Sequence, residues 1–429
     1  MASPAEPILR RLAELHPKRI DLSLGRIERL LARLDHPERR LPPVIHIAGT
    51  NGKGSTLALL DAMLRAAGRR TLRYISPHLV RFNERILIDA VPVDDGRLVA
   101  ALETCERANG SAPITFFEIT TAAAFLIFAE TPADLLLLET GLGGRLDATN
   151  TVERPKLVLL SPISMDHEAF LGTTLAAIAA EKAGILKPEV PAIAGPQRPE
   201  ALAVLEARAR ALGCPLRVHG RDWTARRAGE TLRVEDGAAT LELPLPSLPG
   251  VHQIDNAGLA VVAARSLGAL SPPPASIARG LVEARWPARL QRLSQGPMVE
   301  ALGNGFELWL DGGHNPAAGE VLAASLPALA RGRPVHLILG MLATKDLEAF
   351  LRPLAPLVAS LRTVAVPDEP ATRDPIEEAA IGRRLGIRAE PAPSPLEAAR
   401  ALAAAEPPPG FVLVCGSLYL AGHVLREHR

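Results

Sequence analysis

The chain has 429 residues, and its 48 Lys and Arg nearly balance its 47 Asp and Glu, for a formal net charge of +1. This balance excludes the strongly basic surface that is typical of proteins that bind nucleic acid or acidic membranes. No apolar run reaches the length of a membrane-spanning helix, and the first residues lack the apolar core of a signal peptide. The three cysteines are few and far apart, which predicts a cytoplasmic protein without a zinc site.

The first half of the chain alternates predicted helices and strands. An amphipathic helix at 24–34 comes first, and the apolar stretch VIHIA at 44–48 predicts a buried strand. The elements expected next are a helix that ends at Gly68, strands at 71–75, 134–139 and 156–161, a hairpin that starts at 85–88, and helices at about 94–108, 116–130 and 173–183. This order predicts an α/β fold with a doubly wound, mostly parallel sheet. Ligands bind beyond the carboxyl ends of such strands, where we expect Glu139, Gly141 and Ser161.

The second half predicts a smaller α/β domain. Residues 215–245 alternate and are rich in turns, which indicates a small β region, and a helix is expected within 249–268. We place the domain boundary at SQGPM, 294–298, so that the domains are 1–293 and 294–429. Beyond this boundary the pattern of strands and helices restarts, with strands expected at 306–311, 335–340, 362–366 and 411–415.

The most informative stretch is Gly49–Ser55, GTNGKGS, which joins the strand at 44–48 to a helix. Strand, glycine-rich turn and helix in this order form a phosphate-binding loop, in which backbone N–H groups and the helix N-terminus point at the anion. Lys53 adds a positive charge, and the Ser55 hydroxyl can serve phosphate or a metal. A surface turn that contains a lysine is the alternative, and the flanking strand and helix argue against it.

The loop departs from the common pattern GxxxxGK followed by Ser or Thr. Ile47 stands in place of the first glycine, and Gly54 separates Lys53 from Ser55. These departures disfavour an ordinary GTPase or motor protein. GTNGKGS resembles instead the loop of the Mur ligase superfamily, and in particular that of folylpolyglutamate synthases and dihydrofolate synthases.

Further motifs resemble the same family in the same order along the chain. They are ETGLGGRLDATN at 139–150, HQxxNA at 252–257, WPARLQ at 286–291 with Ala288 in place of a glycine, DGGHNP at 311–316 with Gly313 in place of an alanine, and GMLATKD at 340–346. A chance similarity would not reproduce this order. The resemblance covers most of the chain.

Glu139 is a candidate Mg²⁺ ligand, because a carboxylate at the mouth of a parallel sheet beside a phosphate loop suits a hard cation. An acidic residue that caps a loop is the alternative. The resemblance implies that Ser76 binds the first metal with Glu139, and that His167 and Lys182 belong to a second metal site, with Lys182 carried as a carbamate. From composition alone, His167 is as readily structural and Lys182 as readily a surface lysine.

The resemblance also implies nucleotide, substrate and catalytic residues. ATP would contact Gly49, Thr50, Asn51, Gly52, Lys53, Gly54, Ser55, Gln253, Asn256, Arg289, Asp311 and His314. The folate substrate would contact Arg81, Asn83, Arg85, Thr115, Phe117, Asp147 and Ala148. The catalytic residues would be Lys53, Glu139, His167, Lys182 and His314. Without the resemblance, Phe117 reads as a core aromatic residue.

The function that the resemblance implies is an ATP-dependent amide ligase. Such an enzyme adds L-glutamate to dihydropteroate or to folates through an acyl phosphate, with ATP and two Mg²⁺ ions. A Mur-type ligase that acts on another carboxylate acceptor is the alternative, although the segment before Val44 is too short for the nucleotide-sugar domain of a cell-wall ligase. A non-catalytic ATP-binding regulator would not need the metal residues. We expect a monomer without nucleic acid or membrane partners.

Overall fold

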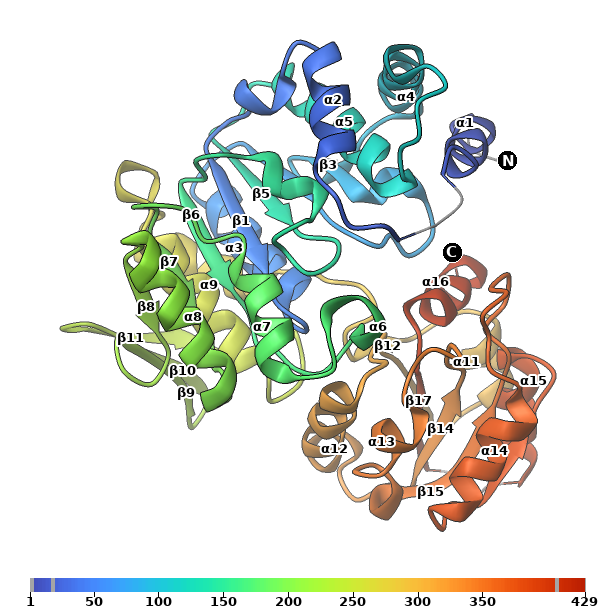
Figure 1. The fold of residues 1–429 in the computed structure, drawn as a ribbon. Coiled ribbons are helices and arrows are strands. Elements are labelled where there is room, and N and C mark those ends of the chain that lie inside the picture. Colours follow the sequence, from blue (N-terminus) through green and yellow to red (C-terminus); the bar gives the residue numbers. More distant parts are fainter. Residues whose placement is uncertain (1–3, 17–19, 406–408, 429) are drawn as a thin grey trace. The chain divides into compact units, whose positions relative to one another are not determined.

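The computed structural model describes residues 4–16, 20–405 and 409–428 (Figure 1). The chain divides into two compact units. The first contains Met1–Ser247 and Ile254–Arg285, and the second contains Leu248–Gln253 and Trp286–Arg429. Each unit is built around its own sheet. None of the helices in the described ranges is long and apolar enough to cross a membrane.

The first unit has an eight-stranded sheet in the order β4-β3-β2-β5-β1-β6-β7-β8. The strands from β2 to β8 in this order run parallel, and the β3–β4 hairpin adds an antiparallel edge. Their bounds are β1 Val44–Ala48, β2 Thr71–Tyr74, β3 Ile86–Ile88, β4 Val91–Pro92, β5 Leu135–Glu139, β6 Leu157–Leu160, β7 Ala192–Ala194 and β8 Leu216–Val218. The predicted doubly wound, mostly parallel sheet is therefore confirmed.

The helices of the first unit bury apolar side chains against this sheet. α1, α2, α4 and α5 share one apolar cluster with β2 and β5, and α7 and α8 share another with β6 and β7. The bounds are α1 Glu6–Ala13, α2 Gly25–Arg33, α3 Lys53–Ala66, α4 Asp95–Asn109, α5 Phe116–Ala129, α6 Glu168–Leu171, α7 Leu175–Ala183, α8 Pro199–Leu212, α9 Gln253–Arg265 and α10 Pro274–Glu283. Short 3₁₀ turns lie at Pro37–Arg39, Phe82–Arg85, Ala148–Thr151 and Gly268–Leu270. α5 is buried nearly throughout, as predicted.

A separate three-stranded antiparallel sheet accounts for most of the small β region predicted at 215–245. It comprises β9 Trp223–Ala228, β10 Thr231–Asp236 and β11 Ala239–Pro244. This sheet packs closely on α9, because a Cβ atom on Gly258 would lie 2.3 Å from the Cβ atom of Ala225. The first part of the predicted region, β8, joins the large sheet instead.

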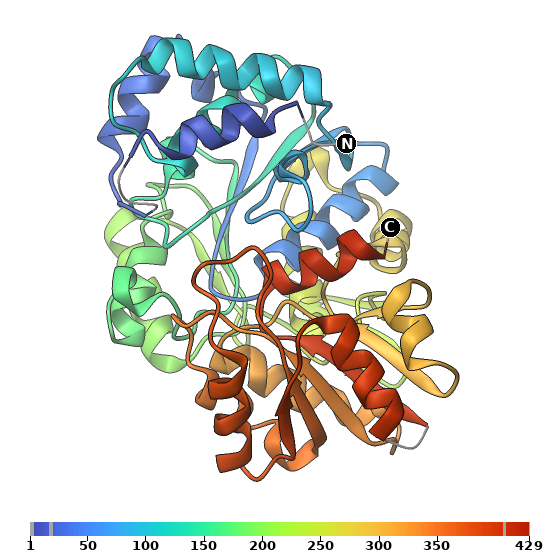
Figure 2. The same cartoon turned by 90° about the vertical axis from the view of Figure 1, so that its right-hand side faces the viewer.

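The second unit is a smaller α/β unit with a six-stranded sheet in the order β12-β13-β17-β14-β15-β16. Figure 2 shows it in orange and red, with helices on both sides of its strands. The strands are β12 Gln291–Leu293, β13 Phe306–Leu310, β14 Val335–Leu339, β15 Val358–Thr363, β16 Ala389–Pro391 and β17 Gly410–Cys415. The helices are α11 Pro297–Leu302, α12 Pro316–Ala330, α13 Leu347–Leu351, α14 Pro375–Arg384, α15 Pro395–Ala405 and α16 Leu418–Glu427, with a 3₁₀ turn at Ala355–Leu357. Among the described strands of this sheet, β12 pairs antiparallel with β13, and the other pairs are parallel.

Two details differ from the sequence-based predictions. The strand expected at 362–366 begins earlier, as VASLRT, and ends at Thr363. Its polar Ser360 is buried and satisfied, because its hydroxyl lies 2.8 Å from Nδ1 of His336 on the neighbouring strand. The second unit begins before residue 294, because Gln291–Leu293 already pairs with β13.

Candidate active site

The phosphate loop (residues 49–55) leaves the end of β1 and enters α3, which begins at Lys53. Two of its glycines have no room for a side chain. A Cβ atom on Gly49 would lie 1.9 Å from Oγ of Ser161, and one on Gly52 would lie 2.4 Å from Oδ1 of Asn256. Gly52 also has a φ of +87°, which favours glycine. The loop backbone therefore passes directly against the end of β6 and against α9.

Thr50 fixes the loop to the segment after β6. Its backbone N–H donates to the carbonyl of Pro162 at 2.9 Å. Its hydroxyl donates to the carbonyl of Ser164 and accepts the Ser164 N–H, both at 3.0 Å. Thr50 therefore stabilises the conformation of the loop through both its backbone and its side chain.

Lys53 folds back over the phosphate loop. Its ammonium group donates to the carbonyls of Gly49 at 3.1 Å and Thr50 at 3.2 Å. The same nitrogen lies 3.9 Å from Oε1 of Glu139. Glu139 ends β5 opposite Ile47 of β1, so the sheet register places its carboxylate beside the start of the loop. Lys53 and Glu139 therefore lie close together at the carboxyl end of the sheet, as predicted.

Lys182 is the second lysine at this loop. It is 5% exposed and donates from Nζ to the carbonyl of Gly49 at 2.9 Å. Burial, and next the charge of Lys53, lowers the pKa of Lys182 to about 7, while Asp166 and Asp147 act in the opposite direction. The alternative of a surface lysine is therefore excluded.

The other two predicted metal residues differ in their surroundings. Ser76 follows β2, the strand beside β5, and its hydroxyl oxygen is buried with no hydrogen-bond partner in the described part of the chain. His167 precedes α6 with a φ of +55°, and its side chain is 39% exposed. Its Nε2 lies 3.9 Å from Oδ1 of Asp166.

The predicted substrate residues of the 81–85 segment bind side chains on either side of the segment, Asp95 and His78. Arg81 forms an ion pair with Asp95 at 3.0 Å. Asn83 is buried, and its side-chain nitrogen donates to Oδ1 of the same carboxylate at 2.9 Å. Arg85 donates to Nδ1 of His78 at 3.0 Å. In this structure, these side chains shape the segment between β2 and α4.

Thr115 and Phe117 begin α5. The Thr115 hydroxyl donates to the carboxylate of Glu118 at 2.8 Å and caps the helix by accepting the N–H of Glu118 at 3.3 Å. The ring of Phe117 lies against the glycine-rich segment after β5, because a Cβ atom on Gly141 would be 2.4 Å from its Cζ atom. Phe117 therefore packs against the segment predicted to hold substrate, rather than only against the core.

The carboxylate of Asp147 accepts hydrogen bonds from its own loop. It accepts the N–H of Leu142 at 2.8 Å, and both the N–H and the hydroxyl of Thr149, at 3.0 Å and 2.5 Å. Nε2 of His46 lies 2.9 Å from the same hydroxyl, so a buried chain joins β1 to the 141–149 segment. Burial raises the pKa of Asp147 and lowers the pKa of His46 to about 3. The neighbouring Ala148 is buried at the start of a 3₁₀ turn.

The second unit holds the predicted residues Arg289, Asp311 and His314. Asp311, at the end of β13, accepts the N–H of Leu290 at 2.8 Å and that of Gly313 at 2.7 Å. Arg289 donates to the carbonyl of Ala288 at 2.8 Å. Nδ1 of His314 lies 2.9 Å from the carbonyl of Gly312.

Gln253 and Asn256, the amides of the HQxxNA motif, fall in different units. Gln253 belongs to the second unit, and its side-chain nitrogen lies 3.0 Å from Nε2 of His252. Asn256 belongs to the first unit and lies against Gly52 of the phosphate loop. The boundary between the units therefore runs through the first turn of α9.

Comparisons with known proteins decide the family. Residues 289–418 match the model of a protein family described as "Mur ligase, glutamate ligase domain". The dihydrofolate synthase/folylpolyglutamate synthase of Escherichia coli K12 is 35% identical over 428 residues, which cover 99% of this chain and 95% of that protein. This chain belongs to the dihydrofolate synthase/folylpolyglutamate synthase family.

Solved structures of the family support the same assignment. The E. coli FolC in complex with DHPP and ADP has a TM-score of 0.89 at 34% identity, over 99% of this chain and 97% of that one. A bifunctional folylpolyglutamate synthase/dihydrofolate synthase with Mn, AMPPNP and L-glutamate bound has a TM-score of 0.86 at 30% identity, over 99% of this chain and 98% of that one. The predicted family and fold are confirmed.

The residues present fit the nucleotide and the metal that the family binds. The loop backbone has glycines where a side chain would collide, and the N-terminus of α3 follows it, as an anion site requires. The unpartnered Ser76 oxygen and the Glu139 carboxylate are hard oxygen donors suited to Mg²⁺. Among the described residues, no group of three or more His, Cys, Asp and Glu could hold a metal by itself. This donor set suits Mg²⁺, which takes few protein ligands together with phosphate oxygens and water.

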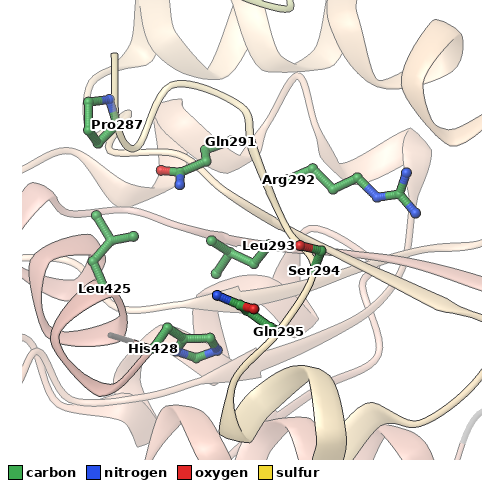
Figure 3. Close-up of a pocket in the computed structure, with 8 residues that line it drawn as sticks. All are labelled: Pro287, Gln291, Arg292, Leu293, Ser294, Gln295, Leu425 and His428. Atoms are coloured by element: carbon green, nitrogen blue, oxygen red, sulfur yellow. The ribbon is translucent and has the colours of Figure 1, made fainter. Parts of the chain in front are cut away.

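A pocket of about 280 Å³ in the second unit contains none of the predicted site residues (Figure 3). It is lined by Pro287, Gln291, Arg292, Leu293, Ser294, Gln295, Leu425 and His428. Its arginine is already paired, because Arg292 lies 3.3 Å from Glu307. We therefore do not assign this pocket to the predicted nucleotide or substrate contacts.

Sequence reasoning missed two contributors to the site. The buried chain from His46 through Thr149 to Asp147 carries no local signal, because His46 and Thr149 are 103 residues apart in sequence. The side chain of Gln291, within the recognised WPARLQ motif, holds the backbone beside Arg289. Its place in the motif was the only available signal.

Proposed function

We propose that this protein adds L-glutamate to dihydropteroate and to folates, with ATP as the energy source. The observation that carries the proposal is the convergence of Lys53 and Lys182 on the carbonyl of Gly49, with Glu139 beside them. A lysine at a glycine-rich loop suits the binding of phosphates, and a carboxylate and a second, buried lysine beside it suit a metal site, the lysine as a carbamate. The relatives named above carry both activities in their names, and their complexes hold nucleotide, Mn and L-glutamate.

The reaction follows from the bonds that must change. A carboxylate oxygen of the acceptor attacks the γ-phosphorus of ATP, and ADP leaves, which gives an acyl phosphate. The uncharged amine of glutamate then attacks the acyl carbon, phosphate leaves, and the nitrogen loses a proton to form the amide. Such phosphoryl transfer depends mainly on positioning and on neutralising charge. The loop N–H groups and Lys53 serve the phosphates in this proposal.

Metal ions would complete this charge neutralisation. When bound, Mg²⁺ draws charge from the phosphate oxygens, and Ser76 and Glu139 would hold it. A second ion would use His167 and Lys182. An ammonium group cannot bind a metal, but a lysine with a pKa of about 7 has an uncharged fraction at neutral pH that can react with CO₂. The resulting carbamate would supply an anionic oxygen.

The roles of the second unit are also proposals. By resemblance, Arg289, Asp311 and His314 would contact the nucleotide. The second unit, which contains all three, would close over the first and exclude water from the acyl phosphate. The substrate contacts would come from Arg81, Asn83, Arg85, Thr115, Phe117, Asp147 and Ala148. We further infer a cytoplasmic protein without nucleic acid partners, supported by the three buried free cysteines and the net charge of +1. That the protein is a monomer stays a prediction.

One assay tests the proposed function. The purified protein is incubated with MgATP and L-glutamate, with either dihydropteroate or a reduced folate as acceptor, and the products are weighed by mass spectrometry. We expect both acceptors to gain one glutamate, with one ADP released for each amide. ADP release with neither acceptor modified would overturn the folate assignment and favour a Mur-type ligase for another carboxylate.

A further inference from the structure

The arginine loop (residues 286–291) has an unusual backbone. Ala288 has a φ of +54° and Leu290 a φ of +44°, and both residues are completely buried. Residues other than glycine rarely adopt this left-handed conformation, which persists only where the surroundings enforce it. Arg289 lies between these two residues, so its direction depends on both.

Two side chains hold the two left-handed residues. Oε1 of Gln291 accepts the N–H of Ala288 at 3.0 Å. Oδ2 of Asp311 accepts the N–H of Leu290 at 2.8 Å. The carbonyl of Ala288 is fixed as well, because it accepts the N–H of Gly312 at 3.0 Å. Figure 3 shows the amide end of Gln291 pointing toward the segment that begins at Pro287.

The guanidinium of Arg289 is anchored to this same backbone. Its Nη1 donates to the carbonyl of Ala288 at 2.8 Å. A Cβ atom on Gly312 would lie 3.0 Å from that nitrogen, so the arginine is closely confined on this side. Rotation of the backbone at Ala288 would therefore move the anchor of the arginine.

We propose that Gln291 is a positioning residue for Arg289. Its amide oxygen keeps Ala288 in the left-handed conformation, and that conformation presents the guanidinium. The inference rests on the proposed function, in which Arg289 contacts the phosphates of ATP. The related motif has glycine at this place, and glycine adopts the conformation without strain. Because this chain has alanine, it depends more on the glutamine.

The experiment compares variants of the full chain by kinetics and by melting temperature. Gln291→Ala removes the acceptor and leaves the buried N–H of Ala288 unpaired. We expect kcat/KM for ATP to fall about tenfold, with KM for glutamate little changed. Gln291→Glu keeps an acceptor oxygen and is expected to retain most activity. Gln295→Ala, at an exposed glutamine of the same pocket, is the matched control and is expected to behave as the parent protein.

Two double variants separate positioning from a structural effect. Ala288→Gly combined with Gln291→Ala should recover most of the lost kcat/KM, because glycine needs no support. In an Arg289→Ala background, Gln291→Ala should not lower kcat/KM further, because Gln291 acts through the arginine. Equal losses from Gln291→Ala with and without Arg289 would overturn the proposal. So would a loss of stability in Gln291→Ala that Ala288→Gly does not correct.

A readout without activity keeps this test separate from the proposed function. Amide hydrogen exchange of residues 286–291 is measured by mass spectrometry in the parent protein, Gln291→Ala and Gln295→Ala. We expect faster exchange only in Gln291→Ala, with recovery in the double variant with Ala288→Gly. Unchanged exchange would overturn the positioning role even if the protein ligates glutamate. Faster exchange in a protein that makes no amide would instead overturn the proposed function and leave the backbone role intact.

Discussion

The side-chain nitrogen of Lys182 donates a hydrogen bond to the carbonyl oxygen of Gly49 at 2.9 Å, across 133 residues of sequence. This contact ties α7 to the first residue of the phosphate loop. It places a buried amine, whose pKa burial lowers to about 7, beside the loop where the carbamate is proposed to bind a metal. Perturbed pKa values of this kind cluster at functional sites, which supports the proposed role of Lys182.

Lys53→Ala tests the phosphate loop. We expect the rate of ligation to fall by about 10²–10³-fold, because the lysine neutralises charge that develops in the transition state. The ammonium group of Lys53 contacts loop carbonyls, so its loss should leave the melting temperature within a few degrees of the parent. Near-normal turnover in a folded variant would contradict the role of the loop.

Lys182 tests the carbamate. Lys182→Ala should lose most activity, and small carboxylates such as acetate should restore part of it. Lys182→Arg should also fail, because a guanidinium does not form this ligand. A carbamate signal in the ¹³C NMR spectrum, after incubation with ¹³C-labelled bicarbonate, should appear in the parent and be absent from Lys182→Arg. Full activity of the arginine variant would refute the carbamate.

His46 should make the protein sensitive to acid. Burial lowers its pKa from about 6.5 to about 3, so the unfolded chain binds the extra proton between these values. Stability from this group is complete above pH 6.5 and is lost as the pH falls toward 3, by at most about 1.4 kcal/mol per pH unit. His46→Gln should flatten the dependence of the unfolding free energy on pH in this range. An unchanged slope would show that His46 does not titrate in this way.

Glu378 should have the opposite dependence. It is fully buried, accepts the N–H of Met341 at 2.8 Å, and burial raises its pKa from 4.5 to about 8. The folded state therefore holds the extra proton between these values, and stability falls as the pH rises through this window. Glu378→Gln should raise the melting temperature at pH 8 more than at pH 5. A variant that is less stable than the parent at pH 8 would contradict the raised pKa.

Local patterns in the sequence were sufficient for the elements that form the phosphate site. The strand at 44–48, the glycine loop and the following helix are contiguous, so one stretch of sequence predicts all three. The parallel sheet then places Glu139 beside them, because parallel strands end at one rim. The strand predicted at 362–366 missed residues 358–361, because Ser360 looks solvent-exposed until its buried partner His336 is known.

Features that depend on partners distant in sequence could not be predicted. The interaction of Lys182 with Gly49 and that of His46 with Thr149 each join residues more than a hundred positions apart. The left-handed backbone at Ala288 and Leu290 is equally hidden, because alanine and leucine do not indicate such a conformation. The N–H of Leu290 donates to the carboxylate of Asp311, a contact that the sequence does not reveal and that ties the aspartate of DGGHNP to the arginine loop.

The acyl phosphate is the central claim, and oxygen transfer tests it most directly. Dihydropteroate labelled with ¹⁸O in its carboxylate is incubated with the protein, MgATP and L-glutamate, and the released phosphate is analysed by mass spectrometry. We predict that each phosphate carries one labelled oxygen, because the oxygen that attacks ATP leaves with the phosphate. Amide formation with unlabelled phosphate would contradict the account.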